Sequence, residues 1–259
     1  MTHTELLKKV QWKDLTRLSS GEMLIENNLT IPWAIISWML AHFGYYLLAL
    51  PFSALFFLTA LRQVHNGFHY SLGTGRKLTW LSLYLNSILM MVSAHAVKFN
   101  HLRHHKYCLS EKDYEGKPAR MSWWKAILYG PIHIFLIHKT GFKEGNRSYR
   151  RNMLIELASI VAFACAAIYF NLSFLVYHCA VMLAGELLSA FFAVWTVHHG
   201  CDEHSIARTQ RSGWKNFITY SMFYHLEHHL FPAVPTIKLP ELARRIDEAV
   251  PGLEKKSTF

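Results

Sequence analysis

Apolar residues in this chain gather into long runs and do not follow the short alternating patterns of a water-soluble core. A helix that crosses a membrane needs about 20 predominantly apolar residues, so runs of this length indicate membrane-spanning helices. The pattern predicts an all-α integral membrane protein. The runs cover about residues 31–61, 78–97, 152–170 and 172–197.

Two helical hairpins account for most of this apolar sequence. The first run is long enough for two helices, with Gly44 and Pro51 as candidate turn residues, and Asn171 separates the last two runs. A hairpin begins and ends on one side of the membrane, so the segments outside the hairpins share that side. We predict one domain, residues 1–259, with four transmembrane helices at about 31–48, 51–69, 152–170 and 173–198 and a cap made of 70–151 and 199–259.

Histidines are concentrated where the apolar runs end. Three clusters have helical spacing: His65 and His69; His101, His104 and His105; His225, His228 and His229. Positions i, i+3 and i+4 share one face of a helix, so each cluster can direct its imidazoles to a single point. A fourth stretch, TVHHGCDEH, ends the last run and offers His198, His199 or His204 as a further ligand.

These clusters predict a metal site. Side chains that can carry charge are costly beside lipid unless they bind something. Neutral imidazole suits zinc, copper, iron and nickel, and eight or nine histidines suffice for two metal ions with four or five nitrogen ligands each. On ligand number, two irons able to activate O2 fit best, although the spacing by itself leaves the other metals open.

A shared site restricts the topology of the remaining apolar segments. The run 78–97 lies between two clusters that must reach the same side, so we expect it to be re-entrant or interfacial and not a full crossing. The stretch 123–138 is broken by Gly130 and Pro131, which predicts an interfacial helix. The remaining histidines are interpreted as packing residues: His3, His42, His95, His133, His138 and His178.

The net charge of +10 bears on how the chain is oriented in the membrane. Positive residues flank the apolar runs, and such residues usually mark the cytoplasmic side, so we expect a cytoplasmic cap and cytoplasmic termini, with a bacterial inner membrane as the location. Nucleic acid is not expected as a partner, because no nucleic-acid-binding module is present. The four cysteines are scattered singly, which argues against a disulfide framework and against an iron–sulfur site.

The segments HNGFH, HLRHH and YHLEHHLFPAVPTIKLPEL resemble the three histidine boxes of the membrane fatty acid desaturase/hydroxylase superfamily, which includes alkane hydroxylases and carotenoid ketolases. The resemblance covers about residues 60–245 and implies four spans, a cytoplasmic cap and a diiron centre that uses O2 and two electrons. It implies a further histidine at the end of the last span, for which His198 fits best, His199 second and His204 third. Some members have an asparagine four residues before this histidine, where this chain has Val194. The ligands implied by the boxes are His65, His69, His101, His104, His105, His225, His228 and His229.

These features together predict an O2-dependent membrane diiron desaturase that introduces a double bond into an aliphatic or acyl-chain substrate. The first alternative is a diiron hydroxylase or ketolase that acts on a hydrocarbon, lipid or carotenoid C–H bond, because the ligands of the two reactions hardly differ. A metal transporter or sensor is a third possibility and predicts histidines at several depths within the spans.

Electrons must come from a separate ferredoxin, rubredoxin or cytochrome, because the sequence has no heme, flavin or nicotinamide motif. The basic stretch from Lys98 to Lys125 is a candidate docking face for an acidic donor. Among the acids, Glu227, Asp202 and Glu203 are candidates to orient imidazole N–H groups. Glu186 lies within the last span, where we expect it to line a substrate cavity or to pair with a neighbour.

Overall fold

The computed structural model describes residues 3–202 and 205–259, and helices dominate these residues. The N-terminal half contains α1 (His3–Lys9), α2 (Ser20–Asn28), α3 (Ile31–His42), α4 (Tyr46–Phe68), α5 (Arg76–Met90), α6 (Ala94–Tyr107), α7 (Trp123–Leu128) and α8 (Gly130–Glu144). The C-terminal half contains α9 (Arg147–Tyr169), α10 (Ser173–Ser189), a π-helical segment (Ala190–Trp195), α11 (Thr196–His198), α12 (Gly213–Ile218), α13 (His225–Leu230) and α14 (Leu239–Ala249). Strands β1 (Arg208–Thr209) and β2 (Lys256–Ser257) pair in parallel.

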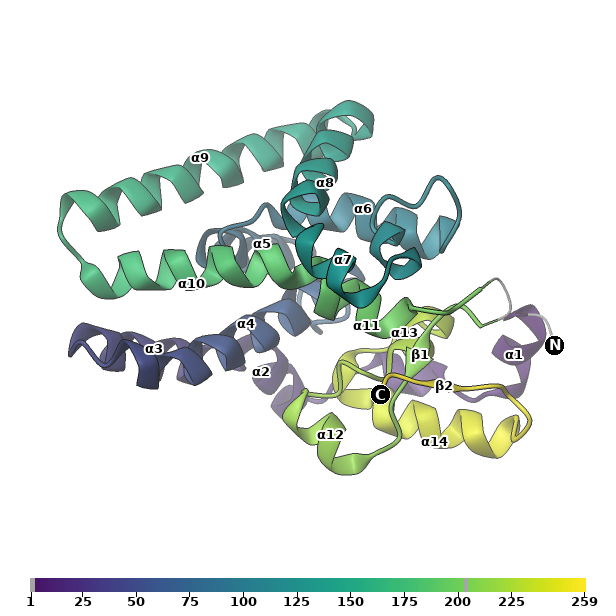
Figure 1. The fold of residues 1–259 in the computed structure, drawn as a ribbon. Helices are drawn as coiled ribbons and strands as arrows, with labels where there is room; N and C mark the ends of the chain where they lie inside the picture. Colours follow the sequence, from purple (N-terminus) through teal and green to yellow (C-terminus); the bar gives the residue numbers. More distant parts are fainter. Residues whose placement is uncertain (1–2, 203–204) are drawn as a thin grey trace.

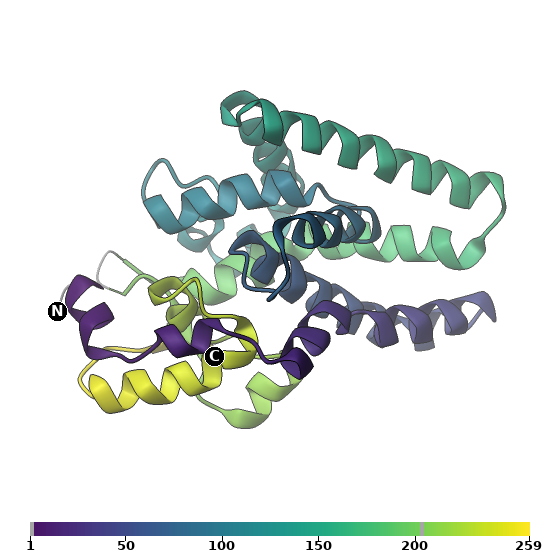
Figure 2. The same ribbon diagram turned by 180° about the vertical axis from the view of Figure 1, so that it is seen from behind.

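Two long hairpins and a compact cap make up the molecule. Figure 1 shows the α3–α4 and α9–α10 hairpins reaching to the left, with both connecting turns at that end. The cap lies at the other end and contains α1, α13, α14 and both chain termini. The same division is visible from behind in Figure 2. Helix α1 and the C-terminal residues therefore lie at the same end of the molecule.

Three helical segments are long and apolar enough to cross a membrane: Tyr46–Phe68, Arg147–Tyr169 and Ser173–His198. Their outward surfaces carry exposed apolar side chains such as Leu154, Val161 and Leu183, as expected for contact with lipid. Helix α3 has 12 residues, about 18 Å, which is shorter than the roughly 30 Å of a bilayer core. The predicted count of four full spans therefore stays a prediction.

The turn of the first hairpin lies earlier than the predicted boundary between 48 and 51. Gly44 has a φ of +81°, a conformation that glycine adopts without a steric penalty, and it ends the hairpin's first helix. Helix α4 then begins at Tyr46 and contains Pro51 within its first two turns. Of the two candidate turn residues, Gly44 lies in the turn, where its positive φ reverses the chain, whereas Pro51 lies within α4.

The apolar run 78–97, which we expected to be re-entrant or interfacial, is divided between two helices and does not form one straight helix. Helices α5 and α6 meet at 110° across a short break in which Met91 has a φ of +61°. The Ser93 hydroxyl caps α6 by accepting a hydrogen bond from the Ala96 N–H, and it donates to Glu156 Oε2 at 2.5 Å. His95 Nδ1 lies 2.5 Å from the other carboxylate oxygen of Glu156, so this histidine has a structural partner. The break lets α6 leave the apolar layer toward the cap.

A buried polar network fastens the cap to α4. The Glu26 carboxylate, fully buried on α2, forms an ion pair with Arg62 and accepts a hydrogen bond from Asn66 Nδ2 at 2.9 Å. The Asn66 side-chain oxygen in turn accepts bonds from the N–H and the hydroxyl of Thr236, at 3.1 and 2.7 Å. Arg62 also donates to the Tyr220 carbonyl at 2.7 Å. Three separate chain segments are thus fixed around one end of α4.

We predict that Arg62→Met destabilises the protein by about 3–5 kcal/mol, because the buried Glu26 carboxylate loses its cation. The double variant Glu26→Gln/Arg62→Met should recover most of this loss, since it removes both charges. Unfolding midpoints in detergent measure both effects. Arg120→Met is the control: its ion pair with Glu111 is exposed and should contribute less than about 1 kcal/mol. A double variant as unstable as Arg62→Met would contradict the prediction.

Candidate metal centre

Four helices deliver histidines to one region of the cap, just beyond the apolar layer. The last turn of α4 carries His65, His69 directly follows this helix, and α11 carries His198. Helix α13 begins directly at His225 and ends at Leu230, because the residue before Pro232 is disfavoured in helical conformation. The complete set from these helices and α6 is His65, His69, His101, His104, His105, His198, His225, His228 and His229.

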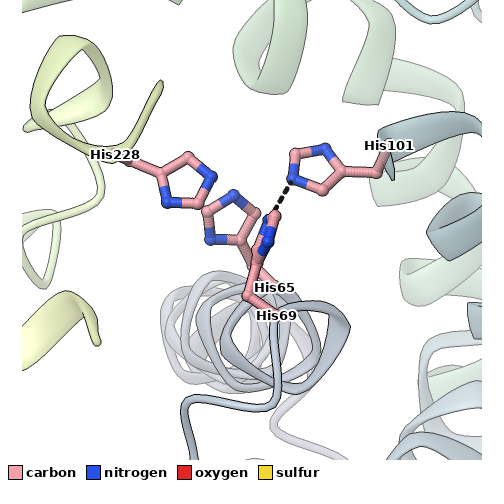
Figure 3. Close-up of side chains that lie close together, drawn as sticks. All are labelled: His65, His69, His101 and His228. Atoms are coloured by element: carbon pink, nitrogen blue, oxygen red, sulfur yellow. Dashed lines mark hydrogen bonds between the residues drawn. The ribbon is translucent and has the colours of Figure 1, made fainter. Parts of the chain in front are cut away.

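One group of imidazoles gathers between α4, α6 and α13. The ring nitrogens Nε2 of His69 and His101 are 3.1 Å apart, and those of His105 and His228 are 2.9 Å apart. His105 Nε2 also lies 3.2 Å from that of His101. Figure 3 shows His65, His69, His101 and His228 pointing toward one another from three different segments. One ligand atom from each of these four lies within 4.8 Å of the others.

A second group lies beside the first and draws on α6, α11 and α13. His198 Nε2 is 3.0 Å from His104 Nε2 and 2.9 Å from His225 Nε2, and His225 is 3.1 Å from His229. The sulfur of Cys108 is also close enough to share an ion with this group. Its thiol, however, points at the Ile206 carbonyl, and burial raises the pKa of Cys108.

The histidines of α13 are held in the form that binds metals. Burial, together with repulsion from neighbouring imidazolium charges, keeps the pKa of His225, His228 and His229 well below that of a free imidazole. Neutral rings present lone pairs and not protons. His65 is buried, and neither of its ring nitrogens has a hydrogen-bond partner among the described residues. Unpaired buried nitrogens are costly, so this arrangement fits bound metal ions.

The other ring nitrogens of three histidines have partners that fix the ring orientation. His104 Nδ1 lies 2.7 Å from an Asp113 carboxylate oxygen, and His101 Nδ1 lies 2.9 Å from Glu115. His198 Nδ1 donates to the Ile206 carbonyl at 2.8 Å. Such partners select the tautomer that leaves Nε2 free for a metal.

Asp113 and Glu115 were not among the acids expected from the sequence. The chain reverses after α6 at Leu109, whose φ is +59°, and the Asp113 carboxylate accepts the Leu109 and Gly116 N–H groups. A Cβ on Gly116 would approach Asp113 Oδ2 to 2.2 Å, so glycine is required there. The sequence feature that could have identified these two acids is the segment KDYEGK, which closely follows the second histidine cluster.

The acids that the sequence did single out lie elsewhere. Glu227 is fully buried, 2.6 Å from Arg211 and 2.6 Å from the Thr209 hydroxyl, and none of its described bonds reaches a histidine. Asp202 accepts a bond from the Ser205 N–H at 2.9 Å. Glu203 and His204 lie outside the described residues.

His198 and His199, two candidate ligands at the end of the last span, have clearly different surroundings. His198 is buried in the second group, whereas the ring of His199 stacks on Trp195 at 3.9 Å and its Nδ1 faces the Trp195 carbonyl. One residue along a helix rotates a side chain by about 100°, which takes His199 out of the group.

The remaining histidines lie apart from both groups. His178 Nε2 donates a hydrogen bond to the Leu89 carbonyl oxygen at 2.8 Å, and His42 packs on Phe174, so both fit the packing interpretation. His138 Nδ1 faces the Ile134 carbonyl. His133 differs, because it is buried and its Nδ1 has no partner among the described residues. The side chain of His3 lies outside the described residues.

A family model described as "Fatty acid desaturase" matches residues 36–256, which is most of the chain. The matched range contains all nine histidines of the two groups. The chain belongs to the fatty acid desaturase family. The resemblance drawn from the three histidine boxes is therefore confirmed.

Two curated desaturases are similar to this chain in amino-acid sequence. A sphingolipid delta(4)-desaturase/C4-monooxygenase of Bos taurus is 28% identical over 195 residues, which cover 67% of this chain and 56% of that protein. The Homo sapiens protein of the same description is 23% identical over 201 residues, covering 72% of this chain and 60% of that protein. This chain thus spans little more than half the length of the relatives it matches.

A cavity of about 250 Å³ runs beside the two histidine groups of this desaturase-family protein. His65, His101, His104, His198 and His225 form one part of its wall. Apolar side chains of α4, α5, α6, α8 and the π-helical segment form most of the rest. The cavity therefore offers an aliphatic molecule a dry path to the metal centre.

The basic docking face needs one correction. Lys98 is only 5% exposed and its ammonium group lies over the Tyr70 ring, at 4.0 Å from the centroid. It is therefore unavailable to a partner protein. Lys106, Lys112 and Lys125 are exposed.

We predict that Asp113→Asn lowers the affinity of the centre for divalent metal by about 10–100-fold, because His104 loses the carboxylate that orients it. Competition with a chelator measures this affinity. Glu111→Gln is the matched control, since the Glu111 side chain is 90% exposed in the same segment. Equal metal affinity in both variants would show that Asp113 does not orient His104.

Proposed function

We propose that this protein is an O2-dependent membrane desaturase that introduces a double bond into an aliphatic or acyl-chain substrate. The observation that supports this best is the convergence of nine histidines from the family's three boxes and the last span, beside a largely apolar cavity. Histidine nitrogens without carboxylate ligands suit two irons, and the cavity suits a hydrocarbon chain.

The two groups divide the proposed ligands. His65, His69, His101, His105 and His228 would hold one iron, and His104, His198, His225 and His229 would hold the other. Two irons held there would supply an oxidant, made from O2 and two electrons, able to remove hydrogen from an unactivated C–H bond. The apolar wall of the cavity excludes water and holds the carbon to be attacked beside the histidines, while Asp113, Glu115 and the Ile206 carbonyl keep three of the rings in place.

A hydroxylase or ketolase acting on a hydrocarbon, lipid or carotenoid is the second candidate. The two relatives carry both a desaturase and a monooxygenase activity in their names, which supports the view that one scaffold serves both reactions. A metal transporter or sensor is less well supported, because the nine clustered histidines lie at one end of the spans and not at several depths.

We further propose four crossings, with the cap and both termini in the cytoplasm of a bacterial cell. Basic residues on the cap side, among them Arg147, Arg150 and Arg151 at the start of α9, support this orientation. Helices α7 and α8 expose Trp123, Trp124 and other apolar side chains, which suits a position at the membrane surface.

Iron content and products test the proposed function. Purified protein loaded with ferrous iron should hold two irons per chain. With O2, a reducing system and a panel of lipids, it should form an alkene with no alcohol intermediate. An alcohol or ketone product would favour the second candidate. Zinc alone, with no O2-dependent product after iron loading, would exclude both.

A pair of adjacent variants tests the ligand assignment. His198→Asn should lower the iron content from two to about one per chain and abolish product formation, because His198 lies in the second group. His199→Asn should retain two irons, since its ring stacks outside that group. Cys108→Ser should also retain two. Loss of iron from His199→Asn with retention in His198→Asn would reverse the assignment.

A separate electron donor is also proposed, of ferredoxin, rubredoxin or cytochrome type, docking on the exposed lysines 106, 112 and 125. With an acidic ferredoxin as donor, turnover should fall several-fold as salt rises from roughly 0.05 to 0.5 M, because salt screens the attraction between the two proteins. Turnover with a small chemical reductant should change little. The same salt response with both donors would rule out electrostatic docking.

A further inference from the structure

The cavity beside the histidines has a second polar region. Asn86, Ser87, His133, Glu186 and Ser189 interrupt its apolar wall. Three of these side chains are satisfied within the protein. The Asn86 amide donates to Gln63 and to the Ser82 carbonyl, the Ser87 hydroxyl donates to the Leu83 carbonyl, and that of Ser189 donates to the Glu186 carbonyl. Their donor groups are therefore already used within the protein.

The other two side chains have unused polar atoms. Glu186 is 6% exposed, and its Oε1 has no hydrogen-bond partner among the described residues. His133 is 5% exposed, and its Nδ1 likewise has none within the described part of the chain. Burying such atoms unpaired costs free energy, and a carboxyl group within a membrane span is especially expensive. Both side chains form part of the cavity lining.

Close helix packing holds these two residues on neighbouring helices. Gly130 begins α8 against the backbone of α10, and a Cβ at that position would come within 1.6 Å of the Leu187 carbonyl oxygen. His133 follows Gly130 by three residues, about one helical turn, and Glu186 directly precedes Leu187. Because Gly130 has no side chain, α8 and α10 pack closely, and His133 and Glu186 both lie on the α8–α10 side of the cavity.

This polar region is well separated from the metal centre. Glu186 and His198 lie on one continuous helical segment, 12 residues apart, which corresponds to roughly 18 Å along the helix. The cavity is lined by both residues. A single extended aliphatic molecule can therefore contact Glu186 at one point and the histidines at another.

We propose that the cavity takes an aliphatic substrate that carries a hydroxyl group remote from the carbon attacked, and that Glu186 and His133 bind this hydroxyl. The proposal rests on the proposed function and narrows its substrate class. A hydroxyl both donates and accepts, so it satisfies Glu186 and His133 whichever of them carries the proton. A carboxylate would face the Glu186 carboxyl group, and an alkane would leave both polar atoms unpaired.

Binding of three simple ligands of equal chain length tests this: dodecanol, dodecane and dodecanoate. Their effect on the unfolding midpoint of the iron-loaded protein in nanodiscs gives apparent affinities without O2 or turnover. Dodecanol should bind about 10–100-fold more tightly than the other two, the ratio expected for hydrogen bonds to a buried charged group. Equal affinities, tighter binding of dodecane or dodecanoate, or no binding of dodecanol would overturn the proposal.

Variants locate the preference. Glu186→Leu should remove it while the iron content stays at two per chain, and His133→Phe should reduce it. Glu186→Gln keeps a donor and an acceptor, so it should retain part of the preference and covers the case in which Glu186→Leu does not fold. Ser189→Ala, on the same cavity wall, should keep the full preference. A preference unchanged in Glu186→Gln and His133→Phe would overturn the assignment.

The two proposals fail in different ways. Protein without bound iron or O2-dependent product would contradict the proposed desaturase while leaving the ligand ranking measurable. Protein with two irons and an O2-dependent product, but without a preference for dodecanol, would contradict only the hydroxyl site.

Discussion

The structure depends on bringing nine imidazoles to two adjacent points. The Nε2 atoms of several neighbouring rings lie about 3 Å apart, and a neutral ring whose Nδ1 holds the proton has only a lone pair to offer there. Such an arrangement is unfavourable unless cations lie between the rings. The contributing residues are spread from His65 to His229, so the chain must return repeatedly to one end of the molecule. The hairpins and the 110° break between α5 and α6 provide these returns.

The cap holds the histidine clusters in register through contacts between the histidine-containing segments themselves. Asn66 lies between the two histidines of the first cluster, and its side chain accepts two bonds from Thr236, in the segment that follows α13. The first cluster is thus tied to the chain that leaves the third. Because Glu26 and Arg62 complete this network from α2 and α4, a shift of either helix would disturb histidines on two elements at once.

Periodicity in the sequence predicted which histidines meet, because i, i+3 and i+4 spacing fixes a shared helical face before any tertiary contact forms. It could not predict features that depend on single backbone conformations. The positive φ of Gly44 moved the first turn, and that of Leu109 returned Asp113 to His104. Burial of Lys98 under Tyr70 is likewise a tertiary contact without a local signal.

The polar residues of the cavity wall also show what sequence patterns alone cannot predict. A lone histidine such as His133 is reasonably interpreted as a packing residue, and Glu186 as a cavity or paired residue, when each is considered alone. Their shared significance arises only because Gly130 lets α8 approach α10 closely and leaves both side chains facing one enclosed space. An apolar substrate would have no use for two unpaired polar atoms in a membrane-embedded wall, where leucine or phenylalanine would be cheaper to bury. If the protein acts as proposed, these two side chains constrain the class of substrate, whereas the histidines bear on how its C–H bond is attacked.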